Sequence, residues 1–155
     1  MGRGLGVLSV TPTIKVAAGV WYIDRNNIKL LPAGGVIWTP NPETNFRILF
    51  PNPKLSHRFA TVGTAEWWWY FTGEYGGGAW TVRRNAAING GISSDRIDYN
   101  DLRVAFGLEW ISCRGIRGHI EAGYVWDREI LFDLSKSPAS WKPDDTVMVR
   151  AGIDF

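Results

Sequence analysis

Cysteine, histidine and net charge are all scarce in this sequence. It contains one cysteine, Cys113, and two histidines among 155 residues. A single cysteine excludes an intrachain disulfide framework and a cysteine-rich zinc site. The 17 basic and 15 acidic residues leave a net charge of +2, too small by itself to indicate a nucleic-acid partner. We therefore expect no metal, no cofactor and no nucleic acid.

Long apolar runs are also missing. The longest one, residues 16–23, is much shorter than the roughly 18 residues that a membrane-spanning helix needs. The first six residues lack the apolar core of a secretory signal. If the protein is exported, we expect this sequence to be a mature or shortened form.

What the sequence does have is an alternation of apolar and polar residues with period two. Residues 96–112 place Val104, Phe106 and Leu108 on one side and Arg103 and Glu109 on the other. Such alternation predicts a β-strand with two different faces. After a turn at residues 113–115, the same pattern continues over residues 116–132, and it returns over residues 146–155.

Earlier segments fit this scheme less regularly. We expect strands over residues 13–24, 28–39, 45–60 and 64–82, with turns at residues 25–27, 40–43 and 61–64. The sequence Pro51-Asn52-Pro53 is either a bulge on one long strand or a hairpin turn. The two alternatives give seven or eight strands.

Strand length and face chemistry favour a membrane barrel. Two predicted strands of about 17 residues exceed both the usual 5–6 and the 9–11 that cross a bilayer. A soluble barrel is apolar inside, whereas a transmembrane barrel is apolar outside, and alternation alone does not separate the two. Three features favour lipid outside: charges of both signs on the polar faces, aromatic residues near strand ends, and a last strand ending on Phe155.

We therefore predict an all-β fold, an antiparallel up-and-down transmembrane β-barrel in which residues 1–155 form a single domain. Its polar faces would line the lumen or pore with Arg103, Glu109, Arg117, His119, Glu121, Asp127 and Arg150. Its apolar faces would contact lipid through Val104, Phe106, Leu108, Ile120, Tyr124, Val149 and Ile153. Because buried charges persist only when paired, we expect the lumenal residues to form ion pairs.

The last strand resembles a known signature. Its sequence, Val-Arg-Ala-Gly-Ile-Asp-Phe over residues 149–155, is similar to the C-terminal signature of bacterial outer-membrane β-barrels. In that class, alternating apolar residues lead to a terminal aromatic residue that the barrel-assembly machinery reads. The resemblance implies an assembly signal that includes Gly152 and Phe155, and outer-membrane lipid and the assembly machinery as partners.

A wider resemblance covers three segments. Leu-Pro-Ala-Gly-Gly-Val-Ile-Trp-Thr-Pro at 31–40, Ile-Leu-Phe-Pro-Asn-Pro at 48–53 and Thr-Gly-Glu-Tyr-Gly-Gly-Gly-Ala-Trp at 72–80 resemble an uncharacterised planctomycete-type family of predicted outer-membrane barrels. The resemblance implies location in a bacterial outer membrane and brings no known activity. Members of that family are longer, so residues 1–155 form either a whole barrel or the C-terminal part of a larger one. A missing N-terminal part or other subunits would complete the larger barrel.

Three functions remain open. The leading one is a passive porin-like or structural barrel with a charged lumen, an aromatic girdle and no catalytic residue. The second is a soluble β-barrel that holds a small apolar ligand against an inward-facing segment 102–110. The third is an outer-membrane lipid-modifying enzyme that uses His119 with a carboxylate, Glu121 or Glu109, although no serine has a convincing place beside them.

Overall fold

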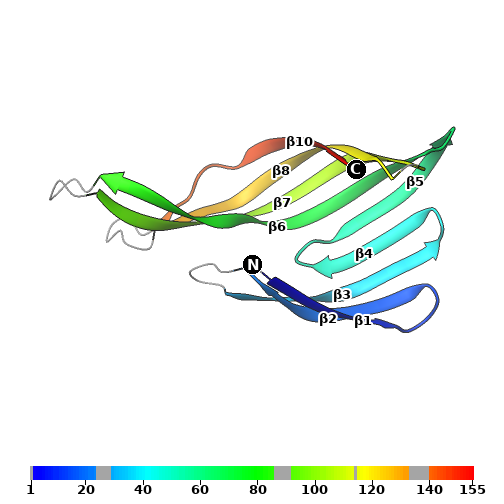
Figure 1. The fold of residues 1–155 in the computed structure, drawn as a ribbon, viewed down its shortest axis with the longest axis horizontal. Helices are drawn as coiled ribbons and strands as arrows, with labels where there is room; N and C mark the ends of the chain where they lie inside the picture. Colours follow the sequence, from blue (N-terminus) through cyan, green and yellow to red (C-terminus); the bar gives the residue numbers. More distant parts are fainter. Residues whose placement is uncertain (1, 24–28, 86–91, 114, 133–139) are drawn as a thin grey trace.

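The computed structural model describes residues 2–23, 29–85, 92–113, 115–132 and 140–155. It is an all-β, antiparallel, up-and-down sheet of ten strands (Figure 1). The strands are β1 Gly2–Ser9, β2 Ile14–Tyr22, β3 Leu30–Asn41, β4 Thr44–Phe50, β5 Lys54–Val62, β6 Ala65–Asn85, β7 Ile92–Ser112, β8 Arg117–Phe132, β9 Ser140–Trp141 and β10 Thr146–Asp154. No helix long enough and apolar enough to cross a membrane occurs in these ranges.

The strands follow one another in space almost as they do in the sequence. The order is β1-β2-β3-β4-β5-β6-β7-β8-β10, and the two-residue β9 pairs with β8. These nine strands are joined by eight pairings, all of them antiparallel. The edge strands β1 and β10 therefore run in the same direction. In the described part of the chain they are not hydrogen-bonded to each other, so the sheet is not closed.

The sheet folds over into two arms. Strands β1–β3 form one arm, β6, β7, β8 and β10 form the other, and β4 and β5 connect the arms (Figure 1). The connecting hairpin is short, because the chain turns at residues 51–53 while β6 continues to Asn85. The amides of Gly73 and Tyr75 on β6 donate hydrogen bonds to the carbonyl oxygens of Pro53 and Pro51, at 2.9 and 3.4 Å. These bonds attach the hairpin end to the side of β6.

The structure has more strands than the seven or eight predicted. Strand β1 was missed because Gly2, Gly4 and Gly6 leave its alternation without large side chains, and β9 has only two residues. Residues 45–60 are not one strand: the prolines end β4, and the hairpin alternative is the one observed. Strands β6 and β7 are longer than predicted: β6 continues past residue 82 to Asn85, and β7 begins at Ile92, before residue 96. The turn predicted at residues 25–27 lies outside the described residues, as do 86–91 and 133–139.

The two faces of the sheet differ as the alternation predicts. We call outer the face that carries one row of directly paired residues, Phe71, Phe106, Ala122 and Val149. We call inner the face that carries the next row, Tyr70, Gly107, Glu121 and Arg150. Outer side chains are open to the surroundings, with 53 % of Phe106 and 74 % of Val149 exposed. Glu121, on the inner face, is 5 % exposed.

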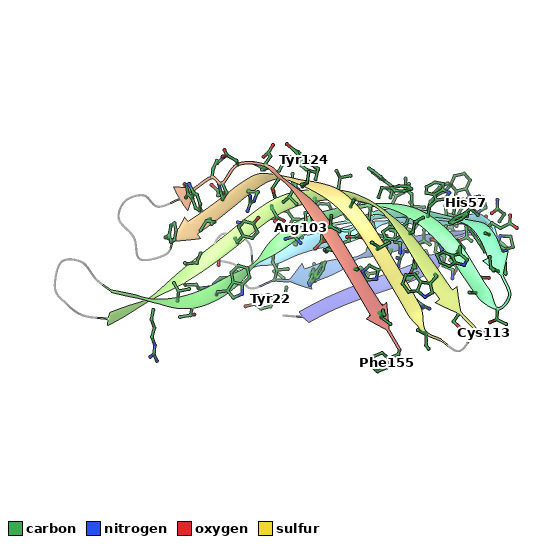
Figure 2. The ribbon with its side chains drawn as sticks, turned by 90° about the horizontal axis from the view of Figure 1, so that it is seen from above. Tyr22, His57, Arg103, Cys113, Tyr124 and Phe155 are labelled. Carbon is green, nitrogen blue, oxygen red and sulfur yellow. The ribbon has the colours of Figure 1, made fainter. Side chains whose placement is uncertain are left out.

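All seven residues predicted to be apolar and lipid-facing share the outer face. Register pairs Val104 with Tyr124 and Leu108 with Ile120, and places Val149 and Ile153 on the same side of β10. Six of the seven are exposed, and Val104 is half-buried. Phe155 follows β10 and projects from its end (Figure 2).

Candidate functional site

A network of charged side chains occupies the inner face of the β6–β10 arm. Arg103 on β7 makes a two-pronged contact with Asp101, with Nε–Oδ1 and Nη2–Oδ2 distances of 2.8 and 2.9 Å. Its Nη1 also lies 3.6 Å from Oε1 of Glu74, the residue opposite it on β6. Figure 2 shows Arg103 well within the length of the strands, away from the turn that holds Cys113. The guanidinium thus joins two carboxylates from neighbouring strands.

Arg150 on β10 extends the network across two more strands. Its Nη1 donates to Oε2 of Glu74 at 3.0 Å, and its Nε donates to Oε1 of Glu121. The second oxygen of Glu121 accepts a hydrogen bond of 2.6 Å from the hydroxyl of Tyr70. Each buried carboxylate therefore has a cationic partner, which is the condition for keeping a charge out of water.

Glycines on the inner face make room for these long side chains. A Cβ at Gly107 would overlap the ring of Tyr70, and a Cβ at Gly76 would overlap the Asp101–Arg103 pair. Side chains of this length fill a narrow interior only where the opposing position is small. The high glycine content of these strands is thus part of the site.

A lysine continues the network onto β5. Nζ of Lys54 lies 2.9 Å from Oε2 of Glu109 and 4.1 Å from the ring centroid of Tyr70. The inner wall therefore combines cations and carboxylates from five strands. Each of the four carboxylates contacts at least one of the three cations, so the charges of the wall are paired across strands.

Four of the seven predicted lumenal residues belong to this network: Arg103, Glu109, Glu121 and Arg150. His119 also faces inward, but its ring lies against Gly152. Although Glu109 is its register partner, no hydrogen bond joins His119 to either Glu109 or Glu121 in the described structure.

Arg117 and Asp127 lie apart from the network. Arg117 is exposed at the start of β8. Asp127 is exposed and lies in a bulge of β8. Between two register pairs, β8 contains one residue more than β7. The φ angle of Asp127 is 48°, in the left-handed region. The bulge breaks the strict alternation from which the position of Asp127 was predicted.

Four members of the network were not predicted from the sequence: Lys54, Tyr70, Glu74 and Asp101. Tyr70 follows three tryptophans, and Glu74 stands in a glycine-rich stretch without clear alternation, so neither was predicted to face the charged side. The register of β6 against β7 identifies both, because it pairs Tyr70 with Gly107 and Glu74 with Arg103. Asp101 was recognisable as a charged residue on the same side as Arg103.

Aromatic residues gather at two levels of the outer face, one near the Cys113 turn and one near the middle of β6 and β7. At the first level, the ring centroids of Trp67 and Trp110 lie 6.0 Å apart. At the second, Tyr124 stacks on Trp126 at 6.3 Å, and the hydroxyl of Tyr124 donates to Oδ2 of Asp145 at 2.9 Å. Tyr124 therefore places its ring on the apolar face and its hydroxyl beside a loop carboxylate.

No group of three His, Cys, Asp or Glu side chains within the described ranges could hold a metal ion. Comparison of the chain with protein-family models, with curated proteins and with solved structures found no match.

Proposed function

We propose that this chain is a transmembrane β-barrel protein of a bacterial outer membrane, porin-like or structural, with a charged interior and no catalytic residue. Its partners would be outer-membrane lipid and, during biogenesis, the barrel-assembly machinery, for which Gly152 and Phe155 form the assembly signal. The proposal includes membership of the planctomycete-type barrel family that the sequence resembles.

The observation that carries this proposal is the spacing of aromatic residues on the outer face. On β6, Trp67 and Tyr75 are eight residues apart and share that face. Trp67 pairs with Trp110, and Leu102, the partner of Tyr75, pairs with Trp126, so the same two levels continue onto β7 and β8. On β6, β7 and β8, apolar residues and glycines occupy the outer positions between these levels.

The β2–β3 pair repeats this spacing. Trp38 pairs with Ile14 at one end and Tyr22 pairs with Leu30 at the other, again eight residues along β2. Eight residues span about 26 Å at roughly 3.3 Å per residue, or about 20 Å in height for a strand tilted by about 40°. This height is close to the apolar band of about 25 Å between the aromatic girdles of membrane barrels.

Burial argues against the soluble-barrel alternative. A soluble barrel would bury Phe106 and its neighbours and expose the charged face. Here Asp101 and Glu121 are 1 % and 5 % exposed, whereas Phe106 is 53 % exposed. A continuous apolar surface of this kind in water would favour aggregation, whereas lipid would accommodate it.

The direction of the edge strands constrains how such a barrel closes. Because β1 and β10 run the same way, an all-antiparallel ring needs an odd number of further strands between them. Another subunit or an additional part of the polypeptide would supply them. The wider ring would then be lined by Arg103 and Arg150 against Glu74 and Glu121, which suits small polar solutes more than one sign of ion.

Partitioning tests the proposal. The protein is expressed behind a signal peptide, extracted with water or detergent, and run on a gel with and without heating. Solubility only in detergent, with a band whose mobility changes on heating, is the expected result. Planar-bilayer conductance then separates a pore from a filled barrel. A monomer that stays in solution without detergent would overturn the proposal.

A further inference from the structure

The inner face is not charged throughout. On the β1–β3 arm its central part carries apolar or small side chains, among them Leu5, Ala17, Trp21, Leu31 and Ala33, and Lys15 lies on the same face near one end of β2. Ala17 and Leu31 are 2 % and 7 % exposed, but Leu5 is 46 % exposed. The interior therefore has an apolar sector on one arm and a charged sector on the other.

A cavity of about 320 Å³ lies on the apolar sector. It is lined by Leu5, Trp21, Ala33 and Leu49, and it reaches the hairpin end at Asn52. Its lining also includes Val20 and Phe50, whose positions belong to the outer face. Its size is at the lower end of the 300–1,000 Å³ typical of small-molecule sites, and its lining is predominantly apolar, as in such sites.

A second cavity leads from this one to the charged sector. It has a volume of about 170 Å³ and shares Trp21, Pro51 and Asn52 with the first. Across from Trp21 it is lined by Glu74 and by residues 75–77 of β6. The two cavities are therefore adjacent. We call them together the hairpin recess; its lining is apolar at Leu5 and includes the Glu74 carboxylate at the other end.

The short β4–β5 hairpin explains why the recess exists. The hairpin ends at residues 51–53, whereas β3 and β6 continue past that level on either side. Gly76 and Gly77 then leave the wall of β6 without side chains, and Gly77 has a φ of +113°, which favours glycine. A Cβ at Gly76 would overlap the Asp101–Arg103 pair, and one at Gly77 would overlap the carbonyl oxygen of Tyr99, so neither position accepts a side chain without a shift of its neighbours.

We propose that the hairpin recess binds a single-chain amphiphile, with its acyl chain against Leu5, Ala33 and Leu49 and an uncharged, hydroxyl-bearing head group at Glu74. Hydrocarbon fits the first end because its lining is apolar. Glu74 is held by Arg103 and Arg150, so its carboxylate is fixed, and its remaining lone pairs accept hydrogen bonds from hydroxyls. A carboxylate head group would instead meet a like charge.

This inference goes beyond the barrel proposal, because it assigns a ligand class to the hairpin recess. The probe is 1-monolauroylglycerol, and the protein is assembled in phospholipid nanodiscs, or kept in buffer if it proves soluble. Bound probe is measured against empty nanodiscs. A heat-modifiable band, or a cooperative unfolding transition in buffer, shows first that each variant is assembled.

Two alanine-to-tryptophan variants give a matched comparison. Ala33→Trp fills the recess, so we expect at least about a tenfold loss of affinity. Ala18→Trp places the same ring on the outer face of the adjacent strand, and we expect no change. Equal binding by the two variants would overturn the proposed site.

The remaining measurements test the orientation of the amphiphile. A monoacylglycerol brominated on its chain should quench tryptophan fluorescence saturably, and Trp21→Phe should remove part of that quenching. Laurate should bind at least about tenfold more weakly than the glycerol ester. Glu74→Gln removes the like charge, so it should reduce this difference in affinity between laurate and the ester. The same variant tests the site if Ala33→Trp does not assemble. Equal binding of laurate and the ester to the unmodified protein would overturn the assignment of the head group.

Discussion

The ring of Tyr70 lies across Gly107, the residue directly opposite it on the neighbouring strand. By crossing that gap, the Tyr70 hydroxyl reaches Glu121, which is the partner of Gly107 on the next strand. Arg150, the partner of Glu121 on β10, completes the row. One row of residues thus links four strands on the inner face. Because Gly107 has no side chain, the Tyr70 ring can cross it and make the hydrogen bond to Glu121.

A side chain at Gly107 should disrupt this row. Gly107→Val places carbon atoms where the Tyr70 ring lies, so the ring must move and Glu121 loses a donor. We expect a loss of about 2–3 kcal/mol in unfolding free energy, measured by urea titration of the assembled protein. Gly4→Val is the control, because nothing lies within 4 Å of a Cβ at that position. Equal losses for the two variants would contradict the packing described.

Removing the Tyr70 hydroxyl should lower the unfolding free energy more than removing the Tyr124 hydroxyl, which also contacts a carboxylate. Tyr70→Phe removes a hydrogen bond to the buried Glu121, and we expect a cost of about 1.5–3 kcal/mol. Tyr124→Phe removes a bond of similar geometry to Asp145 in an exposed setting, where water replaces the lost partner, so the cost should stay below about 0.5 kcal/mol. Chemical denaturation of the two variants side by side measures the difference. A larger loss of unfolding free energy for Tyr124→Phe than for Tyr70→Phe would contradict this prediction.

Adjacent residues of β10 test which face meets lipid. Val149 lies on the outer face and Met148 on the inner one. If the outer face contacts lipid, Val149→Arg should cost about 2–4 kcal/mol near the bilayer midplane, whereas Met148→Arg enters a polar interior and should be tolerated better. The fraction of each variant that assembles into membranes with a heat-modifiable band measures this. The reverse order would argue for a soluble barrel with its apolar face inside.

Cysteine pairs test how the sheet edges close. In a Cys113→Ser background, Val149→Cys is combined in turn with Gly4→Cys, Gly6→Cys or Leu8→Cys on the outer face of β1. We expect no disulfide within a chain, because direct pairing of β1 with β10 would be parallel. Ala122→Cys with Val149→Cys, which are register partners, is the positive control and should cross-link on oxidation. A disulfide between β1 and β10 would instead mean that the two edges pair directly.

Alternation in the sequence by itself determined the strand faces. The positions of Phe106, Ile120 and Val149 on one side, and of Arg103 and Glu121 on the other, follow from period two alone, because successive side chains of a strand point in opposite directions. The ion pairing of Arg103, Glu109, Glu121 and Arg150 was also predictable, since charges removed from water need partners, but within the described residues the same expectation did not hold for Arg117, His119 and Asp127. Strand β1 was not predictable, because Gly2, Gly4 and Gly6 alternate with residues of mixed polarity and leave no apolar–polar contrast between its faces.

Only the tertiary structure decided which residues meet across strands. Register pairs Glu74 with Arg103 and Tyr70 with Gly107, and a shift of one residue would have placed every one of these side chains on the opposite face. The bulge that displaces Asp127 and the short hairpin that creates the recess beside Glu74 are likewise properties of paired strands. A sequence determines the alternation within each strand, but the hydrogen-bond register between strands determines the site.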